Sequence, residues 1–374
     1  ALDVTVQQSI LNILRSLQEK YRMSLVFISH DLGVIAEIAD EVAVMYQGKI
    51  VENGKLTQII HKPQKDYTRG LIACRPSIHK KPHRLPTLEE FLDQSASPAK
   101  QEIVQPKDHE AKQGVLFSIQ KLDKIFTLKT NFFGKATETF TALENINFQI
   151  FKGETLGLVG ESGSGKTTLG RILLNLLPFE NGTVNYKEDS IKKLNRKDLL
   201  QFRQKVQIIF RDPYSSLNPK MSIGQIIEEP LTYHRIFTNK KERRAEVIRL
   251  LNNVKLDESY INRYPHELSG GQRQRIAIAR ALTLNPECII CDEAVSALDV
   301  SIQAEILNLL QELKERYQLT YIFISHDFSV VRFMADRVAV LKEGQLVELS
   351  EADQLFRSAQ NPYTVSLLES VPAF

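Results

Sequence analysis

The two ends of this chain are copies of one another. Residues 1–31 read ALDVTVQQSILNILRSLQEKYRMSLVFISHD, and residues 297–327 read ALDVSIQAEILNLLQELKERYQLTYIFISHD. The offset between the copies still holds, without a gap, at Tyr67 and Tyr363 (363 − 67 = 296). A gapless duplication of this length indicates two copies of one domain. What precedes the second copy has no counterpart before Ala1, so we expect the remnant of one domain, a linker and one complete domain.

Composition sets the boundaries of these parts. The stretch from Ser77 to Gln113 is rich in Lys, His, Pro and Gln and poor in aromatic residues, which is typical of a linker. Within it, Leu85 to Leu92 could dock on a neighbouring surface. The chain begins without Met, so we expect a piece of a longer protein. The expected parts are the remnant (1–75), the linker (76–113), the complete domain (114–355) and a C-terminal extension (356–374).

Charge, hydropathy and cysteine content exclude several classes of protein. A net charge of +3 is too small to indicate nucleic-acid binding by itself. No run approaches the roughly 18 apolar residues that span a bilayer. Three cysteines are typical of a reducing compartment. Cys288 and Cys291 form a CxxC inside an apolar run, where an odd separation places them on opposite faces of a strand, so we expect packing and no metal site.

Apolar runs alternate with helical patterns along the chain. The spacing over Val4–Tyr21 predicts a helix, the run Leu25–Ile28 predicts a buried strand, and the runs around Gln47-Gly48 predict a hairpin. In the complete domain we expect strands at 148–150, 155–159 and 206–210, and helices at 167–177, across most of 223–261, and at 272–284. This alternation predicts an α/β domain with a mainly parallel sheet.

One motif indicates phosphate binding. Residues 160–167, GESGSGKT, fit GxxxxGK[ST] and lie between an expected strand and an expected helix, which is the context that the motif requires. In such a loop the glycines allow backbone N–H groups to cradle phosphate oxygens, Lys166 reaches the terminal phosphates, and the Thr167 hydroxyl ligates Mg²⁺. The alternative, a Gly-rich turn that only caps a helix, is disfavoured by this context. The expected nucleotide-binding residues of the loop are Gly160, Glu161, Ser162, Gly163, Ser164, Gly165, Lys166, Thr167 and Thr168.

Two acidic residues are candidates for a metal and water site, and a second Gly-rich turn is a candidate phosphate-binding surface. The apolar run CIIC ends in Asp292 and Glu293. Such acids are usually only solvated, but beside a phosphate loop Asp292 could hold Mg²⁺ and Glu293 could polarise an attacking water. Before the helix near Gln272, Ser269 can act as a cap and two glycines expose N–H groups that form a second phosphate-binding surface. The residues of this second turn are Leu268, Ser269, Gly270, Gly271 and Gln272.

These motifs, with the loop 296–299 and a final His326, stand in the order found in ABC-transporter ATPase domains, which the chain resembles from Val115 to about Asp353 and, for the first copy, from Ala1 to about Arg75. The resemblance implies a P-loop NTPase fold of ABC type, with a mixed sheet core and a helical subdomain. It implies that two domains face head to tail, with each ATP between one phosphate loop and the other domain's LSGGQ signature. In that family Glu293 would be the catalytic carboxylate and His326 would contact the γ-phosphate. The loop at the dimer seam would be Ser296, Ala297, Leu298 and Asp299.

The family also stacks adenine on an aromatic residue upstream of the phosphate loop. Phe126 occupies a suitable position, and Phe140 is the competitor. Either ring could instead belong to the core.

A narrower resemblance points to the oligopeptide/dipeptide/nickel importer branch. It rests on DPYSSLNP (212–219), NPYT (361–364) and DYTRGL (66–71). Some ATPases of this branch carry both domains in one chain. The chain departs from the family pattern where Arg211 replaces a Gln that contacts Mg²⁺ and where Ala294 replaces a Pro. A guanidinium cannot ligate Mg²⁺ and repels it, so we expect Arg211 to depress turnover.

The resemblance implies an ATP- and Mg²⁺-dependent subunit that energises import of peptides or similar solutes. Its expected partners are transmembrane permease subunits, a solute-binding protein and the second ABC domain of the full-length chain, with no nucleic acid. The expected location is the cytoplasmic face of the plasma membrane. A soluble tandem ATPase acting on ribosomes or DNA is the alternative, as is a catalytically impaired half, but the prolines between Ser77 and Gln113 do not suit the long helical linker of such tandem proteins.

Overall fold

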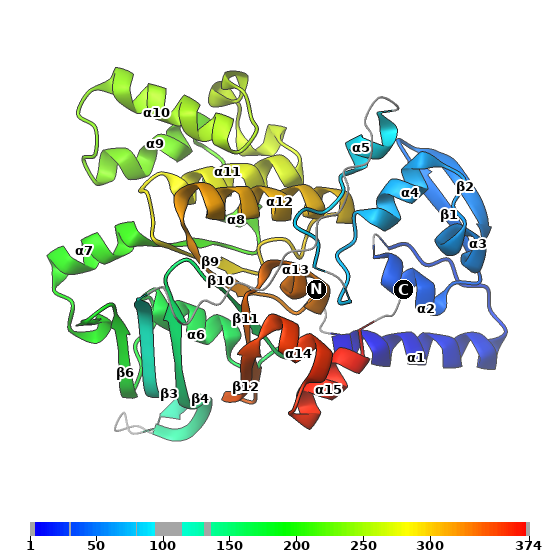
Figure 1. Cartoon of the computed structure of the whole chain (residues 1–374), viewed down its shortest axis with the longest axis horizontal. Helices are drawn as coiled ribbons and strands as arrows, with labels where there is room; N and C mark the ends of the chain where they lie inside the picture. The colour runs from blue at the N-terminus through cyan, green and yellow to red at the C-terminus, as the bar shows by residue number, and fades with distance from the viewer. Residues whose placement is uncertain (1–3, 30, 80, 94–113, 131–135, 372–374) are drawn as a thin grey trace.

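The structure of the protein is a computed structural model that describes all residues except 1–3, 30, 80, 94–113, 131–135 and 372–374 (Figure 1). Within the described residues, no helix is both long enough and apolar enough to cross a membrane.

The centre of the complete domain is a six-stranded sheet in the order β12-β11-β5-β10-β9-β8. Neighbouring strands run parallel except at the edge, where β12 is antiparallel to β11. The predicted α/β class is therefore confirmed. The strands are β5 (Thr155–Val159), β8 (Val206–Ile209), β9 (Cys288–Asp292), β10 (Thr320–Ile324), β11 (Arg337–Lys342) and β12 (Gln345–Glu351).

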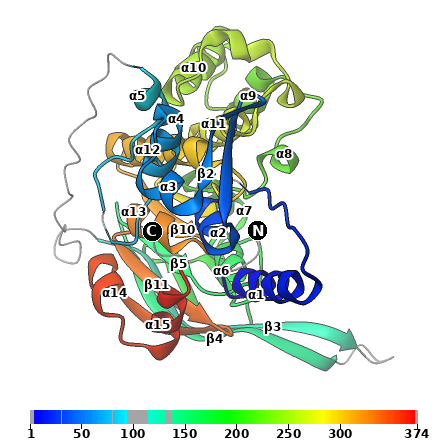
Figure 2. The same ribbon diagram turned by 90° about the vertical axis from the view of Figure 1, so that its right-hand side faces the viewer.

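A second, four-stranded antiparallel sheet has the order β4-β3-β6-β7. Figure 2 shows its two long strands projecting together beyond the rest of the domain. With the first sheet it makes the mixed core expected of the fold. Its strands are β3 (Val115–Thr130), β4 (Ala136–Phe151), β6 (Asn181–Tyr186) and β7 (Asp189–Ser190).

Helices cover both faces of the parallel sheet, and Figure 1 shows α9 to α12 on one side and α6 on the other. The two faces carry separate apolar clusters: Cys291 packs in the cluster of the α9–α12 side, and Cys288 in that of the α6 side. The prediction that these two cysteines point to opposite faces is confirmed. The helices are α6 (Lys166–Leu173), α7 (Arg196–Lys205), α8 (Pro213–Ser216), α9 (Ile223–Tyr233), α10 (Lys240–Asn253), α11 (Gly270–Leu282), α12 (Val300–Tyr317), α13 (Phe328–Met334), α14 (Ala352–Ser358) and α15 (Pro362–Glu369), with 3₁₀ turns η1 (Ile191–Lys193), η2 (Glu258–Asn262) and η3 (Pro265–Glu267).

The predicted helix over 167–177 is too long. Helix α6 ends at Leu173, and Asn175 adopts a left-handed conformation with φ 52°. Asn tolerates this conformation better than most residues, which explains why the helix ends here despite the apolar residues that follow.

The first copy folds like the second wherever both have the same neighbours. Its hairpin of β1 (Glu41–Tyr46) and β2 (Lys49–Lys55) shifts register after Val44, just as β11 and β12 do after Val340 (340 − 44 = 296). Glu52 accepts hydrogen bonds from two successive backbone N–H groups, and Glu348 does the same in the second copy. The helices of the first copy are α1 (Val4–Tyr21), α2 (Leu32–Ile38), α3 (Leu56–His61) and α4 (Asp66–Ala73).

The predicted buried strand at Leu25–Ile28 is wrong. These residues form no strand, and Val26 and Ile28 are 88% and 92% exposed. The matching segment of the second copy is β10, which is held between β5 and β9. The chain contains no first-copy residues that correspond to those two neighbours, so the same apolar run has no strands to pair with.

The linker docks on the complete domain, as predicted for Leu85 to Leu92. The backbone of Leu85 donates to Asn308 Oδ1 (2.9 Å) and accepts from Asn308 Nδ2 (2.8 Å), and both residues are buried. Asn308 lies on α12, and the short helix α5 (Leu88–Leu92) packs against α4. The linker thereby joins the first copy to the surface of the second.

Candidate functional site

The phosphate loop takes the shape that its glycines allow. It connects the end of β5 to the start of α6. Gly160 has φ 143°, and a Cβ there would lie 2.1 Å from the backbone oxygen of Leu341. Gly165 has φ 102°, and its Cβ would lie 2.8 Å from the backbone oxygen of Ala142. No residue with a side chain fits either position, so the loop depends on both glycines.

Lys166 begins α6 and folds back over the loop. Its side chain is buried, and its ammonium donates to the carbonyl oxygens of Gly160 (2.7 Å) and Glu161 (2.6 Å). Two carbonyl groups thus hold the positive charge at the mouth of the loop. This arrangement suits exchange of the carbonyl contacts for an anion.

Asp292 and Thr167 are brought together from different elements. Asp292 ends β9, and the Thr167 hydroxyl on α6 donates to Asp292 Oδ1 at 3.3 Å. Burial raises the pKa of Asp292, although the hydrogen bond from Thr167 opposes the shift. A buried carboxylate beside a hydroxyl offers the oxygen ligands that Mg²⁺ prefers.

Glu293 lies at the centre of the charged groups. Its backbone is left-handed with φ 50°, and its N–H donates to the carbonyl of Ile324 at the end of β10. Its Oε1 lies 3.5 Å from His326 Nδ1, and its Oε2 lies 3.1 Å from Arg211 Nη1. The hydrogen bond with His326 lowers the pKa of Glu293 against the effect of burial, and the positive charges of Arg211 and Lys166 lower the pKa further. The carboxylate is therefore held as an anion.

The contact between Arg211 and Glu293 was not foreseen from the sequence. Arg211 follows β8 and is 44% exposed on its side chain. Glu293 Oε2 accepts no well-aligned hydrogen bond from the described residues, so the attraction to Arg211 is mainly Coulombic. The predicted effect of Arg211 on Mg²⁺ stays a prediction.

The signature turn caps α11 as expected. Ser269 Oγ accepts from the N–H of Gln272, and Gln272 Oε1 accepts from the N–H of Ser269, which together make a capping box. The side-chain amide of Gln272 also donates to Tyr260. Helix α11 lies on the opposite side of the sheet from α6 (Figure 1). The backbone N–H groups of the turn thus belong to a different layer from the phosphate loop of the same domain.

The expected seam loop, 296–299, lies beside the first copy. Ser296 Oγ donates to the backbone oxygen of Glu293. A cavity of about 450 Å³ is lined by residues 295–298 of this loop region and, from the first copy, by residues that include Leu11 and Asp31. Arg211 and His326 line the same cavity. His30, the counterpart of His326, lies outside the described residues.

The two candidate adenine-stacking residues face each other across strands β3 and β4. Phe126 pairs with Phe140 in the strand register. Phe126 is half-buried with the Lys124 ammonium 4.9 Å from its ring centre, and Phe140 is 51% exposed. Neither ring belongs to the core clusters, and the assignment of Phe126 stays a prediction.

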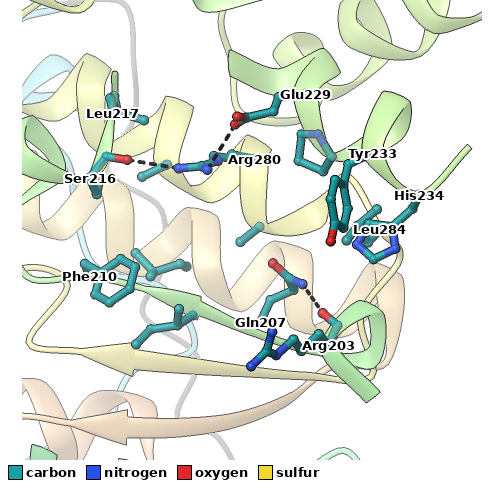
Figure 3. Close-up of a pocket in the computed structure, with 15 residues that line it drawn as sticks. Arg203, Gln207, Phe210, Ser216, Leu217, Glu229, Tyr233, His234, Arg280 and Leu284 are labelled. Carbon is teal, nitrogen blue, oxygen red and sulfur yellow. Dashed lines mark hydrogen bonds and ion pairs between the residues drawn. The ribbon is translucent and has the colours of Figure 1, made fainter. Parts of the chain in front are cut away.

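A groove beside β8 was missed by the sequence reasoning. It has a volume of about 350 Å³ and lies between the end of β8, α9 and α11. Figure 3 shows Arg280 reaching from α11 toward the backbone oxygen of Ser216 (2.9 Å) and toward Glu229 (3.2 Å). Exposed Phe210 and Tyr233 contribute apolar surface. In the sequence, this groove was indicated only by the DPYSSLNP string (212–219), which follows Arg211 and contributes Ser216 and Leu217 to the groove lining.

Comparisons with known proteins agree with this geometry. The family model described as ABC transporter matches residues 143–296. The model described as oligopeptide/dipeptide transporter, C-terminal region, matches twice, at 51–100 and 347–374, and the two matches begin 296 residues apart (347 − 51).

The curated relatives include the glutathione import ATP-binding proteins GsiA of Escherichia coli strain K12, 45% identical over 378 residues, and of Shigella flexneri, 45% identical over 377. Each alignment covers 100% of this chain, and the chain spans 60% of the length of each relative. Among solved structures, the dimeric ATP-binding cassette MJ0796 bound to ADP and Pi is 32% identical with a TM-score of 0.56, over 63% of this chain and 98% of the cassette. The cbiO1 structure from Clostridium perfringens is 27% identical with a TM-score of 0.57, over 66% of this chain and 92% of that one.

The order of the motifs, the sheet that carries them and these likenesses agree with one another. The chain belongs to the ABC transporter family, and its C-terminal region is that of the oligopeptide/dipeptide branch.

Proposed function

We propose that this chain is the ATP-binding part of an ABC importer, and that it hydrolyses MgATP at a head-to-tail domain interface to drive uptake of peptides or similar small solutes. One observation carries the proposal: the phosphate loop, the adjacent acids Asp292 and Glu293, and His326 come from three separate places in the sequence and converge at one edge of the parallel sheet. The names of the glutathione-importing relatives support a peptide-like solute.

The donor set at this edge fits Mg²⁺. The Thr167 hydroxyl and the Asp292 carboxylate would hold the ion, together with nucleotide phosphates. When bound, the ion would neutralise charge that develops on the transferred phosphoryl group. The raised pKa of Asp292 is consistent with a carboxylate that is buried without a strong cation partner of its own.

The protein groups have separate tasks in this proposal. Lys166 exchanges its contacts with the loop carbonyls for phosphate oxygens. Glu293, held as an anion, orients the attacking water and takes its proton. His326, which contacts Glu293 in this structure, holds the carboxylate in position and reaches the γ-phosphate. Phe126 stacks on the adenine.

The signature turn acts on a different nucleotide. It presents the N-terminus of α11, whose first N–H groups are available to phosphate oxygens. Since α11 and the phosphate loop lie in different layers, the turn would complete the site of a facing ABC domain, with the seam loop 296–299 between the two sites. In the full-length protein that facing domain is the first copy.

We assign the groove at β8 to the permease. Exposed Phe210 and Tyr233 provide the apolar contact, and Arg203, Arg280 and Glu229 provide charges around it (Figure 3). A short amphipathic helix with acidic and apolar residues would match this surface. Through the permease and a solute-binding protein, the subunit would be held at the cytoplasmic face of the plasma membrane.

A soluble tandem ATPase acting on ribosomes or DNA fits less well. The described part of the linker contains one helix, α5, of only five residues. Other described linker residues dock on the second copy through Leu85, which is hydrogen-bonded to Asn308 on α12, and through Lys81, which donates to the backbone oxygen of Ala335 after α13. The described residues of the linker, 76–79 and 81–93, therefore contain no long charged helix of the kind that joins the domains of such tandem proteins.

The test is ATP hydrolysis and assembly by the full-length protein. Glu293→Gln should remove Mg²⁺-dependent hydrolysis, whereas Glu258→Gln, which changes an exposed ion pair with Arg244 at the start of η2, should not. Tyr233→Ala should weaken co-purification with the permease in detergent, and Leu128→Ala, an exposed apolar residue outside the groove, should not. Hydrolysis that persists in Glu293→Gln, or assembly unaffected by Tyr233→Ala, would contradict the corresponding half of the proposal.

A further inference from the structure

A buried glutamine on the signature helix has no hydrogen-bond partner within the part of the chain that the structure describes. Gln274 lies on α11, four residues after Gly270, and is fully buried. Among the described residues, neither its Nε2 nor its Oε1 has a hydrogen-bond partner. Leaving a buried amide unpaired is unfavourable, so such a group ordinarily has a partner in some state of the protein.

A small cavity joins this amide to Arg211. It has a volume of about 140 Å³ and is lined by both side chains, with Asp212, Tyr214 and Ala297 among its other walls. Arg273 also lines it, but the Arg273 guanidinium lies over the Tyr214 ring and donates to the backbone oxygen of Pro265. Of the two arginines in the lining, Arg211 is the one that is also paired with Glu293.

Arg211 is held loosely at its present position. Its Nη1 lies 3.1 Å from Glu293 Oε2 without a well-aligned hydrogen bond, and its side chain is 44% exposed. Arg211 also lines the larger cavity that the first copy covers, so it stands between the two cavities. A partly exposed and poorly aligned ion pair can be broken at little cost.

We propose that Arg211 is a two-position switch and that Gln274 is its second partner. In one position the guanidinium pairs with Glu293 and occupies the carboxylate that should receive the proton of water. In the other it donates to Gln274 Oε1 in the small cavity and leaves Glu293 free. Both are positioning residues, and the inference rests on the ATPase activity proposed above.

The switch links hydrolysis to the position of the signature helix. Gln274 moves with α11, and the N-terminus of α11 is the signature turn. Arg211 follows Phe210, which lines the groove assigned to the permease. A movement of α11 or of the groove wall therefore changes which partner of Arg211 is nearer.

The experiment is a double-mutant cycle in the full-length protein, read as kcat and KM at saturating Mg²⁺. Arg211→Gln should raise kcat by about fivefold, which corresponds to the loss of one partly exposed ion pair, and should leave KM for ATP within about twofold. Arg211→Lys retains the charge beside Glu293 and should stay near the parent kcat. Gln274→Met should lower kcat by a similar factor, because the second position is lost.

Two features distinguish the switch from a packing role. Gln274→Met should raise Tm while it lowers kcat, because it replaces an unpaired buried amide by an apolar side chain of similar size. In the Arg211→Gln background, Gln274→Met should have no further effect on kcat. A Gln274→Met effect that is equal in both backgrounds, or an unchanged kcat in Arg211→Gln, overturns the switch.

A second cycle separates this inference from the proposed function. In nucleotide-free protein, the effects of Arg211→Gln and Glu293→Gln on Tm should be non-additive, because each removes the same ion pair. Additive effects overturn the switch whether or not ATP is hydrolysed. Non-additive Tm effects with no hydrolysis by any variant would instead overturn the proposed ATPase function, and with it the switch's part in catalysis.

Discussion

Replacement of Lys166 by Ala tests the phosphate loop most directly, and the structure predicts two separate effects. In the nucleotide-free protein the ammonium donates to the carbonyls of Gly160 and Glu161 at 2.7 and 2.6 Å. On the proposed function, it would gain charge-assisted bonds to phosphate when nucleotide binds. The mutation should therefore remove a contact with phosphate and also the two hydrogen bonds that stabilise the loop.

The loss of affinity follows from the charged hydrogen bond. Such bonds contribute about 1.5–3 kcal/mol, so we expect the Kd for MgATP to rise by about 10- to 150-fold. Without Lys166, the carbonyl groups of Gly160 and Glu161 lose their hydrogen-bond donor. Water can replace it at Glu161, which is partly exposed. A destabilisation of about 1 kcal/mol there would lower Tm by about 1–2 °C for a chain of 374 residues.

Isothermal titration calorimetry and thermal melts on the same preparations measure both effects. Lys255→Ala is the matched control, because it removes an exposed lysine that pairs with Glu312 on the surface. An affinity within threefold of the parent would refute the role of Lys166 in phosphate binding. A lower affinity with an unchanged Tm would support that role but contradict the claim that the hydrogen bonds of Lys166 to the loop carbonyls stabilise the fold.

Three further predictions can be checked with the same protein. In the full-length protein, Glu293→Gln should keep ATP binding, lower hydrolysis by at least about 100-fold and accumulate a closed ATP-bound form by size-exclusion chromatography; turnover at the parent rate would place the base elsewhere. Burial raises the pKa of Glu52, but hydrogen bonds from Thr68 and from two backbone N–H groups outweigh it, so the pKa lies below 4.5 and the carboxylate stabilises the fold above that pH. Glu52→Gln should therefore lower Tm at pH 7, and the difference should shrink as the pH falls below about 4.5; melts at pH 7, 5 and 3.5 measure it, and a constant difference would contradict the argument. The 374-residue chain should show weak ATPase activity that rises more than linearly with concentration, since two signature turns must meet two phosphate loops; constant specific activity on dilution with a monomeric mass by light scattering would refute it.

Much of the fold was predictable because it depends on local sequence. The strand at Thr155–Val159, the loop that follows and the capping of α11 by Ser269 are set by nearby residues. The run Leu25–Ile28 was mispredicted for the opposite reason. Its strand character depends on neighbours in the sheet, and identical periodicity gives β10 in one copy and exposed chain in the other.

The candidate site was predictable as a set of residues but not as a set of contacts. The motifs named Lys166, Asp292, Glu293 and His326, and the structure places them together. The pairing of Arg211 with Glu293 joins residues 82 positions apart (293 − 211) and leaves no pattern in the sequence. The unpaired amide of Gln274 is likewise visible only once the surrounding atoms are placed.

The hydrogen bonds between Leu85 and Asn308 alter the mechanics of the whole chain. A free 38-residue linker would be flexible, with ends about 35 Å apart on average. A displacement of one domain would then not be transmitted to the other. These hydrogen bonds leave only 11 residues, 74–84, between the end of α4 at Ala73 and the point where Leu85 is fixed to α12. Helix α12 begins at Val300, directly after the seam loop. We therefore expect a displacement of the first copy to be transmitted along α12 to residues 296–299, which on the proposed function lie between two nucleotide sites.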